Sequence, residues 1–310
     1  MINVNSERAK DIAEILLNNY YVNNKGIFGL TFGNVPEFKF NCPPGMERGS
    51  NEHIIYLTLL MSLNYNRDAG KLWEAVHGAY INENYRWIFN VREINSHNHE
   101  DLSDVLQVSE IAQRAEQDVK IWEKISESIL DICKGRLKQF IKKECDNDAV
   151  LLFYMMKFRY KIFFPFLSGD KILPLWIRFL KDYCHIKLKN LEKIMIPIDI
   201  HVARTTAYLG CISSDEVRSY KLNDIKYYID KAWEKVIYIN RANGNSFIKL
   251  DIDEPLWNLG RKGCTKMKNR KCPKSDKCPV SEFCLAIDID NDINVNSRNN
   301  DIRLYYDKNK

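Results

Sequence analysis

The stretch IPIDIHVARTT, residues 196–206, places an acid, an imidazole and a guanidinium within two helical turns. Pro197 restricts the residue before it and ends any preceding helix, so we expect Asp199 at or near the N-cap of a new helix. There its carboxylate accepts backbone N–H bonds and stays ionised near neutral pH. A fixed anion of this kind stabilises a positive charge that develops during a reaction. Asp199 is therefore a candidate catalytic residue, with His201 and Arg204 as supporting residues.

A second candidate lies in FFPFLSGDKILPLWIRFL, residues 163–180. A loop ending in Gly169 leads into an apolar helix, which places Lys171 at the start of that helix. The helix dipole and the apolar surroundings both disfavour the ammonium form, and the neutral amine is a nucleophile. The alternative is a surface lysine and a simple capping aspartate, since both are common in helical proteins.

The cysteines are distributed unevenly along the chain. Four of the nine lie in one short segment with the spacing C-x7-C-x5-C-x5-C: Cys264, Cys272, Cys278 and Cys284. Four thiolates that close such short loops can hold one tetrahedral Zn²⁺ or one [4Fe–4S] cluster, and spacing alone does not choose between them. The alternative is a solvated loop that carries four free thiols.

The same segment is strongly basic. Its cations would repel one another unless they face a polyanion or a thiolate cluster, and we interpret them as a grip on DNA phosphates. They are opposed only by Asp276 and comprise Arg261, Lys262, Lys266, Lys268, Arg270, Lys271, Lys274 and Lys277.

The bulk composition describes a folded chain. It has 310 residues, 45% of them hydrophobic, and a net charge of +5, which permits an anionic partner without demanding one. No apolar run long enough to span a membrane is present, and the N-terminus has polar and acidic residues where a signal peptide would be apolar. We therefore expect a cytoplasmic protein, with no membrane partner, whose cysteines are reduced.

Apolar residues recur with helical spacing along most of the chain. The pattern predicts an all-α protein with short connections, and a mobile tail rich in Asn and Asp over residues 286–310. The expected amphipathic helices cover about 7–21, 52–64, 68–80, 109–141, 147–162, 171–184, 199–210 and 225–237.

The residues quoted above resemble motifs of the helix-hairpin-helix (HhH-GPD) superfamily of DNA glycosylases. In that family a hairpin ending in Gly-x-Lys is followed by a helix start of the type Val-Asp-x-His-Val-x-Arg, and 169–171 and 198–204 match these motifs in order. The cysteine segment is similar to the C-x6-C-x2-C-x5-C cluster of the endonuclease III branch. The separation of the lysine and the aspartate is more similar to that in archaeal 8-oxoguanine glycosylases.

Two departures accompany this resemblance. The hairpin segment 165–171 has one residue more than the family's Leu-Pro-Gly-x-Gly-x-Lys and lacks its first glycine. The middle cysteine spacing is five residues in place of two. A longer loop between ligands costs little closure entropy, so the cysteine cluster remains expected.

The resemblance implies a two-lobed all-α DNA glycosylase with a C-terminal metal-cluster loop held by four cysteines. It divides the chain into an N-terminal segment 1–59 packed on the C-terminal lobe, a central lobe 60–198, and a C-terminal lobe 199–285 ahead of the tail. It assigns catalysis to Lys171 and Asp199 and phosphate binding to Gly169 and the basic segment.

The implied activity is base-excision repair. A damaged, oxidised base would be removed from double-stranded DNA through a lysine Schiff base, with associated AP lyase activity, by a monomer associated with the nucleoid. The implied cofactor is a [4Fe–4S] cluster, with Zn²⁺ as the alternative. A zinc-stapled DNA-binding module without catalysis and a glycosylase without lyase activity are the other two hypotheses, and the sequence does not name the lesion.

Overall fold

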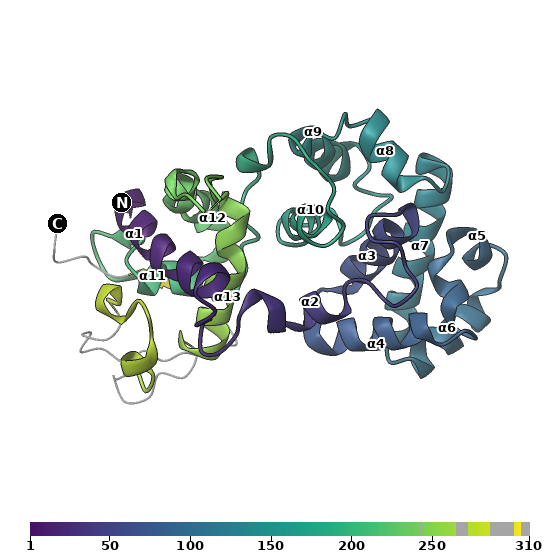
Figure 1. Ribbon diagram of the computed structural model, residues 1–310, viewed down its shortest axis with the longest axis horizontal. Coiled ribbons are helices and arrows are strands. Elements are labelled where there is room, and N and C mark those ends of the chain that lie inside the picture. Colours follow the sequence, from purple (N-terminus) through teal and green to yellow (C-terminus); the bar gives the residue numbers. More distant parts are fainter. Residues whose placement is uncertain (242, 265–271, 286–300, 305–310) are drawn as a thin grey trace. The chain divides into compact units, whose positions relative to one another are not determined.

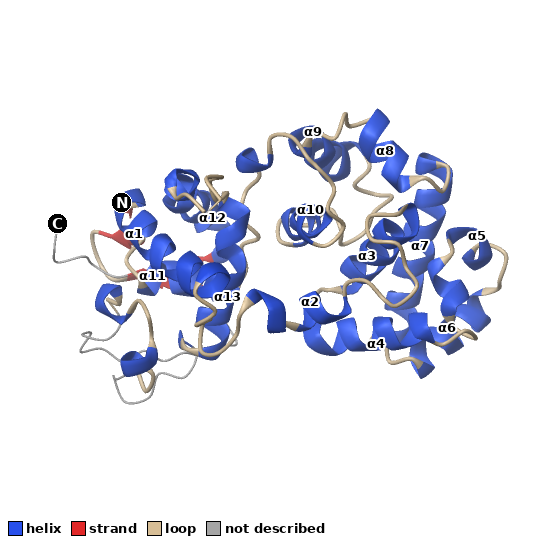
Figure 2. Ribbon diagram, in the orientation of Figure 1, coloured by secondary structure: helices blue, strands red, loops and turns tan. Residues whose placement is uncertain are grey.

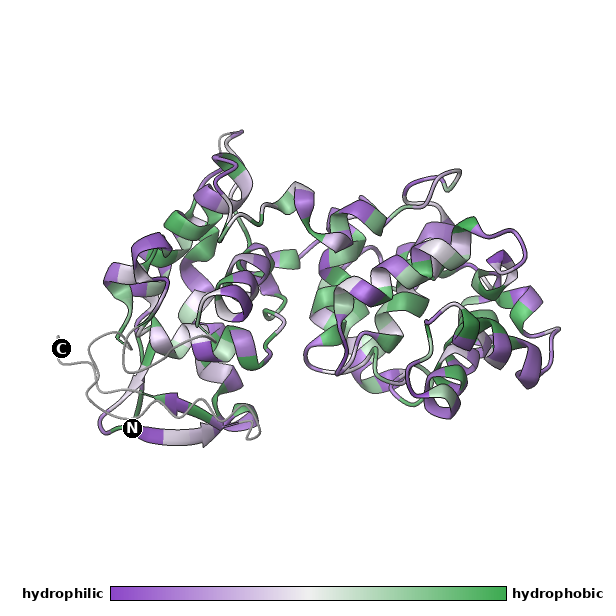
Figure 3. Ribbon diagram, turned by 90° about the horizontal axis from the view of Figure 1, so that it is seen from below, coloured by the Kyte–Doolittle hydropathy of each residue, from purple (hydrophilic) through white to green (hydrophobic). Residues whose placement is uncertain are grey.

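The computed structural model describes residues 1–241, 243–264, 272–285 and 301–304. Helices make up most of this part of the chain, and the strands in it are short (Figure 2). Figure 3 shows that the helices carry both hydrophobic and hydrophilic residues, as amphipathic helices do. The expected helical class is therefore confirmed. None of the described helices has the length and apolarity needed to cross a membrane.

The chain divides into two compact units. Unit 1 combines residues 1–32 with 195–310, and unit 2 is the continuous stretch 33–194. The chain therefore passes between the units twice. In Figure 1, α1, α11, α12 and α13 belong to unit 1, whereas α2 to α10 belong to unit 2.

Unit 2 is built around α3, in which every residue from His53 to Leu63 is buried. This helix packs against α7 and α10, so it has no solvent face and shows almost no amphipathic pattern. The helices of the unit are α2 Pro36–Phe40, α3 Asn51–Leu63, α4 Ala69–Ile81, α5 Val91–Ile94, α6 His99–Val108, α7 Ala115–Cys133, α8 Leu137–Lys143, α9 Ala149–Tyr154 and α10 Ile172–Asp182. Shorter turns are the 3₁₀ segments Arg86–Phe89 and Leu191–Lys193 and the π-helical turn Met155–Arg159.

Unit 1 packs its helices around one hydrophobic core to which both ends of the described chain contribute. Its helices are α1 Ser6–Leu17, α11 Ile200–Tyr208, α12 Leu222–Ala232 and α13 Asp253–Lys262, with a π-helical turn at Asn18–Val22. Its 3₁₀ turns are Trp233–Tyr238, Lys249–Ile252, Ser275–Lys277 and Ser281–Phe283, and a further one, Phe32–Asn34, lies at the boundary between the units.

Two short antiparallel ladders complete unit 1. Strand β1 (Ile2–Val4) pairs with β2 (Ile212–Ser214), and β3 (Arg218–Lys221) pairs with β4 (Asp301–Leu304). Ile302 and Leu304 are fully buried in the core of the unit. Residues 301–304 therefore differ from the mobile tail that composition predicts, because two alternating apolar side chains give this short strand a buried face.

The boundaries of the units also differ from the expected ones. Residues 33–59, expected to pack with the C-terminal lobe, belong to unit 2, because α3 begins at Asn51 and packs on α7 and α10. Residues 195–198 belong to unit 1, because Ile196 and Ile198 are buried in its core. The composition of the connections gave no signal for either boundary.

Candidate active site and cysteine cluster

Asp199 is the N-cap of α11, as the preceding proline predicted. Its backbone is extended (φ −117°, ψ −174°), and Oδ1 accepts hydrogen bonds from the backbone N–H groups of His201 at 2.8 Å and Val202 at 3.0 Å. The side chain remains partly exposed. Two backbone donors and the positive end of the helix dipole both favour the carboxylate form.

The segment that leads to Asp199 is firmly anchored. Ile196 and Ile198 are buried in the core of unit 1, and the Ile196 N–H donates to Oδ1 of Asp230 at 3.0 Å. The other oxygen of Asp230 accepts from Nζ of Lys249 at 2.7 Å. The direction in which the chain enters α11 is therefore set by side chains far away in sequence.

A glycine allows α11 and α13 to approach closely. A Cβ added at Gly260 would lie 2.7 Å from Oγ1 of Thr205 and 2.8 Å from the carbonyl oxygen of His201. Both distances are shorter than side-chain packing tolerates, so only glycine fits at this crossing. Helix α13 thus supports α11 along the first turns after Asp199.

His201 and Arg204, the two residues expected to support Asp199, have different surroundings. The His201 ring lies edge-on to Trp257, with 6.1 Å between ring centroids, and Arg261 lies over the same indole at 5.0 Å. Burial raises the pKa of Tyr208 to about 12, and the nearby positive charge of Arg204 opposes that rise. Both residues therefore lie near other side chains of unit 1.

Lys171 occupies the residue immediately before α10, in unit 2. Its backbone is helical (φ −91°, ψ −50°), and no side chain caps this helix start. The Leu175 N–H donates to the Lys171 carbonyl oxygen at 3.3 Å. The next nine residues, 172–180, are all buried, so the lysine stands where an apolar helix meets the surface.

The loop before Lys171 contains an aromatic residue with an unusual backbone conformation. Phe166 adopts a left-handed backbone conformation (φ +61°), which is strained for a residue with a side chain. Its ring packs against Tyr65 at 5.4 Å, and the guanidinium of Arg114 lies 5.6 Å from its centroid. These contacts offset the strain, and a glycine at 166 would lack them.

A lysine outside the quoted motifs fixes the other side of the hairpin. Nζ of Lys157 donates to the Ser168 carbonyl oxygen at 3.1 Å and forms an ion pair with Asp170. The Gly169 N–H donates to the Phe166 carbonyl oxygen at 3.1 Å, so this amide is engaged within the hairpin. Gly169 has a negative φ, so it is not the left-handed residue of this turn.

The four expected cysteine ligands come together. Cys264, Cys272, Cys278 and Cys284 all line one small cavity in unit 1. Its other walls are largely apolar and include Phe28, Tyr208, Leu209 and Leu259. The remaining cysteines are scattered: Cys133, Cys145, Cys184 and Cys211 are buried in cores, and burial raises the pKa of each thiol.

The cavity is attached to the end of α11 opposite Asp199. Oγ1 of Thr205 contacts Sγ of Cys264 at 4.0 Å, and the Leu285 N–H donates to the Tyr208 carbonyl oxygen at 2.8 Å. Arg8 bridges the two sides by donating to the carbonyl oxygens of Leu209 and Phe283, each at 2.7 Å. A group held in this cavity would therefore brace the helix that carries Asp199.

Four thiols gathered at one cavity are the ligand set of either a [4Fe–4S] cluster or a Zn²⁺ ion. A single Zn²⁺ would need its four sulfurs about 3.8 Å apart, given a Zn–S bond of about 2.3 Å. Four iron and four sulfide ions form a larger body and hold their cysteines farther apart. The residue types therefore fit both groups.

The basic residues expected to bind phosphate are described only in part. Lys262 is exposed, and Arg261 is engaged with Trp257. Lys274 donates to the Lys262 carbonyl oxygen and lies over Phe28, so it supports the cysteine loop. The other expected phosphate ligands, Lys266, Lys268, Arg270 and Lys271, lie outside the described residues.

Some functional neighbours could not be found from the sequence. Tyr65, Arg114 and Lys157 fix the hairpin, and Phe28 supports the cysteine loop, from positions with no motif around them. Thr205, which also contacts the loop, directly follows the motif at 198–204. The aromatic residues Trp73, Phe164 and Trp176 are fully buried in unit 2. They belong to its core.

Comparisons with known proteins assign no family to this chain: it matches no protein-family model and no curated protein.

Lys171 belongs to unit 2 and Asp199 to unit 1, so the structure describes each within its own unit.

Proposed function

We propose that this chain is a base-excision DNA glycosylase of the helix-hairpin-helix type with associated AP lyase activity. The observation that carries the proposal is the contrast between two helix starts separated by one connection. Lys171 follows the hairpin at a helix start that has no side-chain cap, whereas Asp199 caps the next helix start by accepting two backbone N–H bonds. A nucleophilic amine and a permanent anion are the two groups that the reaction needs.

The reaction begins with the damaged base rotated out of the duplex. The neutral amine of Lys171 attacks C1′ of the sugar while the C1′–N bond breaks, and the base leaves with the bonding electron pair. Asp199 stabilises the positive charge that develops on the sugar. The ring then opens to a Schiff base between Nζ and C1′.

The Schiff base permits strand cleavage. It acidifies the proton on C2′, and loss of this proton drives β-elimination of the phosphate at C3′. Water then hydrolyses the Schiff base and releases the lysine. Phosphates of the duplex would be bound by the exposed Lys262 and by the basic residues of segment 265–271. The substrate class is an oxidised base in double-stranded DNA.

The four cysteines would hold a [4Fe–4S] cluster, or one Zn²⁺ as the alternative, and the role proposed for it is structural. The group would join segments 264–284 to the C-terminal end of α11 through Thr205 and Tyr208. Absorption near 400 nm together with iron analysis of the purified protein separates the two: a brown, iron-containing protein supports the cluster, and a colourless one containing zinc excludes it.

Borohydride trapping tests the catalytic assignment. Incubation with duplexes that each carry one lesion, followed by reduction, should yield a covalent complex with wild-type protein and none with Lys171→Gln. Lys181→Gln is the matched control, because it lies on the last turn of the same helix and pairs with the neighbouring Asp182 at 3.0 Å. Equal trapping by wild type and Lys171→Gln would overturn the role of Lys171.

A second candidate follows from the fact that α11 uses Asp199 as an ordinary cap. If base release and trapping are absent for every lesion while duplex binding persists, the chain is a non-catalytic DNA-binding module stapled by zinc. Base release without trapping identifies a glycosylase without lyase activity.

A further inference from the structure

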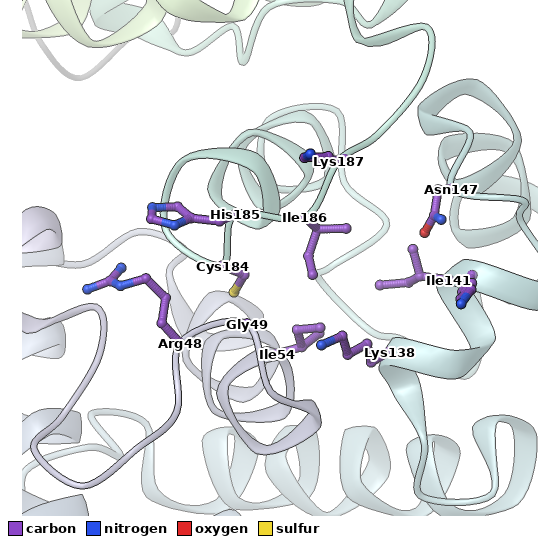
Figure 4. A pocket seen from close by; sticks show the side chains of 11 residues that line it. Arg48, Gly49, Ile54, Lys138, Ile141, Asn147, Cys184, His185, Ile186 and Lys187 are labelled. Atoms are coloured by element: carbon purple, nitrogen blue, oxygen red, sulfur yellow. The ribbon is translucent and has the colours of Figure 1, made fainter.

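A second cavity lies in unit 2, at the end of α10 opposite Lys171. It has a volume of ≈ 360 Å³ and is open to solvent. Its walls come from the loop before α3, from α8 and from the residues that follow α10 (Figure 4). Since α10 has 11 residues, the two ends of this helix are about 16 Å apart. The cavity is therefore distinct from the surroundings of Lys171.

The cavity is bordered by positive charge. Five basic side chains line it, all of them exposed: Arg48, Lys138, Lys142, His185 and Lys187. Figure 4 shows Arg48 and His185 on one side, with Lys187 and Lys138 on opposite walls. No acidic residue lines the cavity. Cations on several walls can surround an anion that carries more than one negative charge.

These cations are not used in ion pairs within the described part of the chain. The guanidinium of Arg48 donates to Oδ1 of Asn41 and to the carbonyl oxygen of Tyr183, each at 2.7 Å, so its neutral partners fix its direction without cancelling its charge. No carboxylate lies within ion-pair distance of Lys138, Lys142 or Lys187. Unpaired cations around a concave surface are what a phosphate-binding site requires.

The floor of the cavity is apolar. Ile54 and Ile141 are buried beneath it and Ile186 is half-buried. Beside them lies the half-buried amide of Asn147, which has two donor hydrogens and one acceptor oxygen to offer. Apolar surface with one amide suits a flat, heteroatom-containing ring, because the ring faces are apolar and the edges form hydrogen bonds.

The walls of the cavity are held in place by backbone geometry. Gly49 has a left-handed conformation (φ +72°), and a Cβ there would lie 2.4 Å from the carbonyl oxygen of Cys184. The neighbouring ring of His53 accepts from the Gly49 N–H at 2.9 Å and contacts the carbonyl oxygen of Asn41 at 2.8 Å. The loop that carries Arg48 is thus fixed against the end of α10, and the cavity is largely formed before any ligand binds.

We infer that this cavity, bordered by Arg48, Lys138, Lys142, His185 and Lys187 and floored by Ile54, Ile141 and Ile186, is a nucleotide-binding site. The phosphates lie among the cations and the base lies on the half-buried Ile186, with its edge toward Asn147. The nucleotide is either a free nucleoside polyphosphate or part of a nucleic-acid single strand, since both present the same phosphate and ring. The inference goes beyond the proposed glycosylase reaction and does not depend on it.

A matched pair of variants on α8 tests the site. Lys142 lines the cavity, whereas the next residue, Lys143, is equally exposed and does not. Binding of a fluorescent adenosine triphosphate analogue, followed by anisotropy on the full chain, should be saturable. Lys142→Glu should weaken it about tenfold, because a nearby attraction becomes a repulsion, and Lys143→Glu should change it by less than about twofold. Equal weakening by both substitutions, or no saturable binding, overturns the site.

Competition identifies the ligand. Unlabelled adenosine triphosphate should displace the probe at lower concentration than inorganic tripolyphosphate, since only the former has a ring for the apolar floor. Equal displacement overturns the assignment of a nucleotide. Displacement by a short oligothymidylate supports a single strand as the source, and its absence supports a free nucleotide. Lys171→Gln should retain the binding, so failure of this site and failure of the glycosylase proposal are distinguishable.

Discussion

The starts of α10 and α11 are built in opposite ways. At α11, Asp199 accepts two backbone N–H bonds and its charge complements the helix dipole. At α10, Lys171 provides no side-chain cap and places a cation where the dipole disfavours one. The aspartate therefore stabilises its helix where it stands, whereas the charge of the lysine opposes the dipole. A cap explains Asp199 without any chemistry, but a helix start does not favour a lysine.

Because only Asp199 caps its helix, substitutions at Lys171 and Asp199 should have different effects on stability. Replacement of Lys171 removes no helix cap. Asp199 has a structural role as well, and its two roles must be measured independently.

The largest expected effect is at Asp199, where one substitution distinguishes its capping role from the proposed role of its negative charge. Asn caps helices about as well as Asp, so Asp199→Asn should change the free energy of unfolding by less than about 0.5 kcal/mol. The same substitution removes the anion, and borohydride trapping should fall by about a hundredfold or more. Thermal unfolding and trapping rates of the same preparation check both statements. Full activity in Asp199→Asn would remove the catalytic role.

A second aspartate cap provides the control. Asp148 caps α9 by accepting from the N–H groups of Val150 and Leu151, and these bonds lower the pKa of its carboxyl. Asp148→Ala and Asp199→Ala should each cost about 1 kcal/mol of stability, since each exposes the same kind of unpaired donors. Only Asp199→Ala should also lose trapping. A matching loss in Asp148→Ala would indicate that activity follows stability.

The next effect concerns His53, which fixes the loop 41–49 beside the C-terminal end of α10. Burial lowers the pKa of this fully buried imidazole from 6.5 to about 4. Between those pH values the unfolded chain binds a proton that the folded chain does not. Stability should therefore fall as pH drops through this window, by up to about 3 kcal/mol at its lower end.

Chemical denaturation at a series of pH values measures this dependence. His53→Gln should lose part of the stability at neutral pH and show a shallower decline between pH 6.5 and 4. His97→Gln, which changes an exposed histidine, should retain the wild-type profile. An unchanged slope in His53→Gln would show that other groups govern the acid sensitivity of unit 2.

The last prediction compares two helical glycines. Gly260→Ala should destabilise the protein by about 2 kcal/mol, because its Cβ would contact α11 at 2.7 Å and the helices would have to separate. Gly78→Ala in α4 meets nothing within 4 Å and should stabilise by about 0.5–1 kcal/mol through helix propensity. Thermal unfolding measures both. Equal shifts in the two variants would contradict the close crossing of α11 and α13.

Much of the secondary structure follows from local pattern. The apolar period predicted helices where α1, α3, α4, α10 and α11 are found, and Pro197 correctly predicted the cap at Asp199. Strand β4 was missed, because four residues in a polar tail carry no local signal and depend on pairing with β3. The start of unit 2 at residue 33 was also missed. Helix α3 is buried along nearly its whole length, so its sequence does not indicate which unit it packs in.

The sequence by itself determined which residues can do chemistry: a lysine at one helix start, an aspartate at another and four closely spaced cysteines. These are local features, set by residue type and by spacing along a few turns. Only the tertiary structure decided that the four thiols line one cavity, that Phe166 adopts a left-handed conformation, and that four cations and a histidine from three separate segments surround a second cavity. Such arrangements depend on packing between residues far apart in the chain, which no local pattern records.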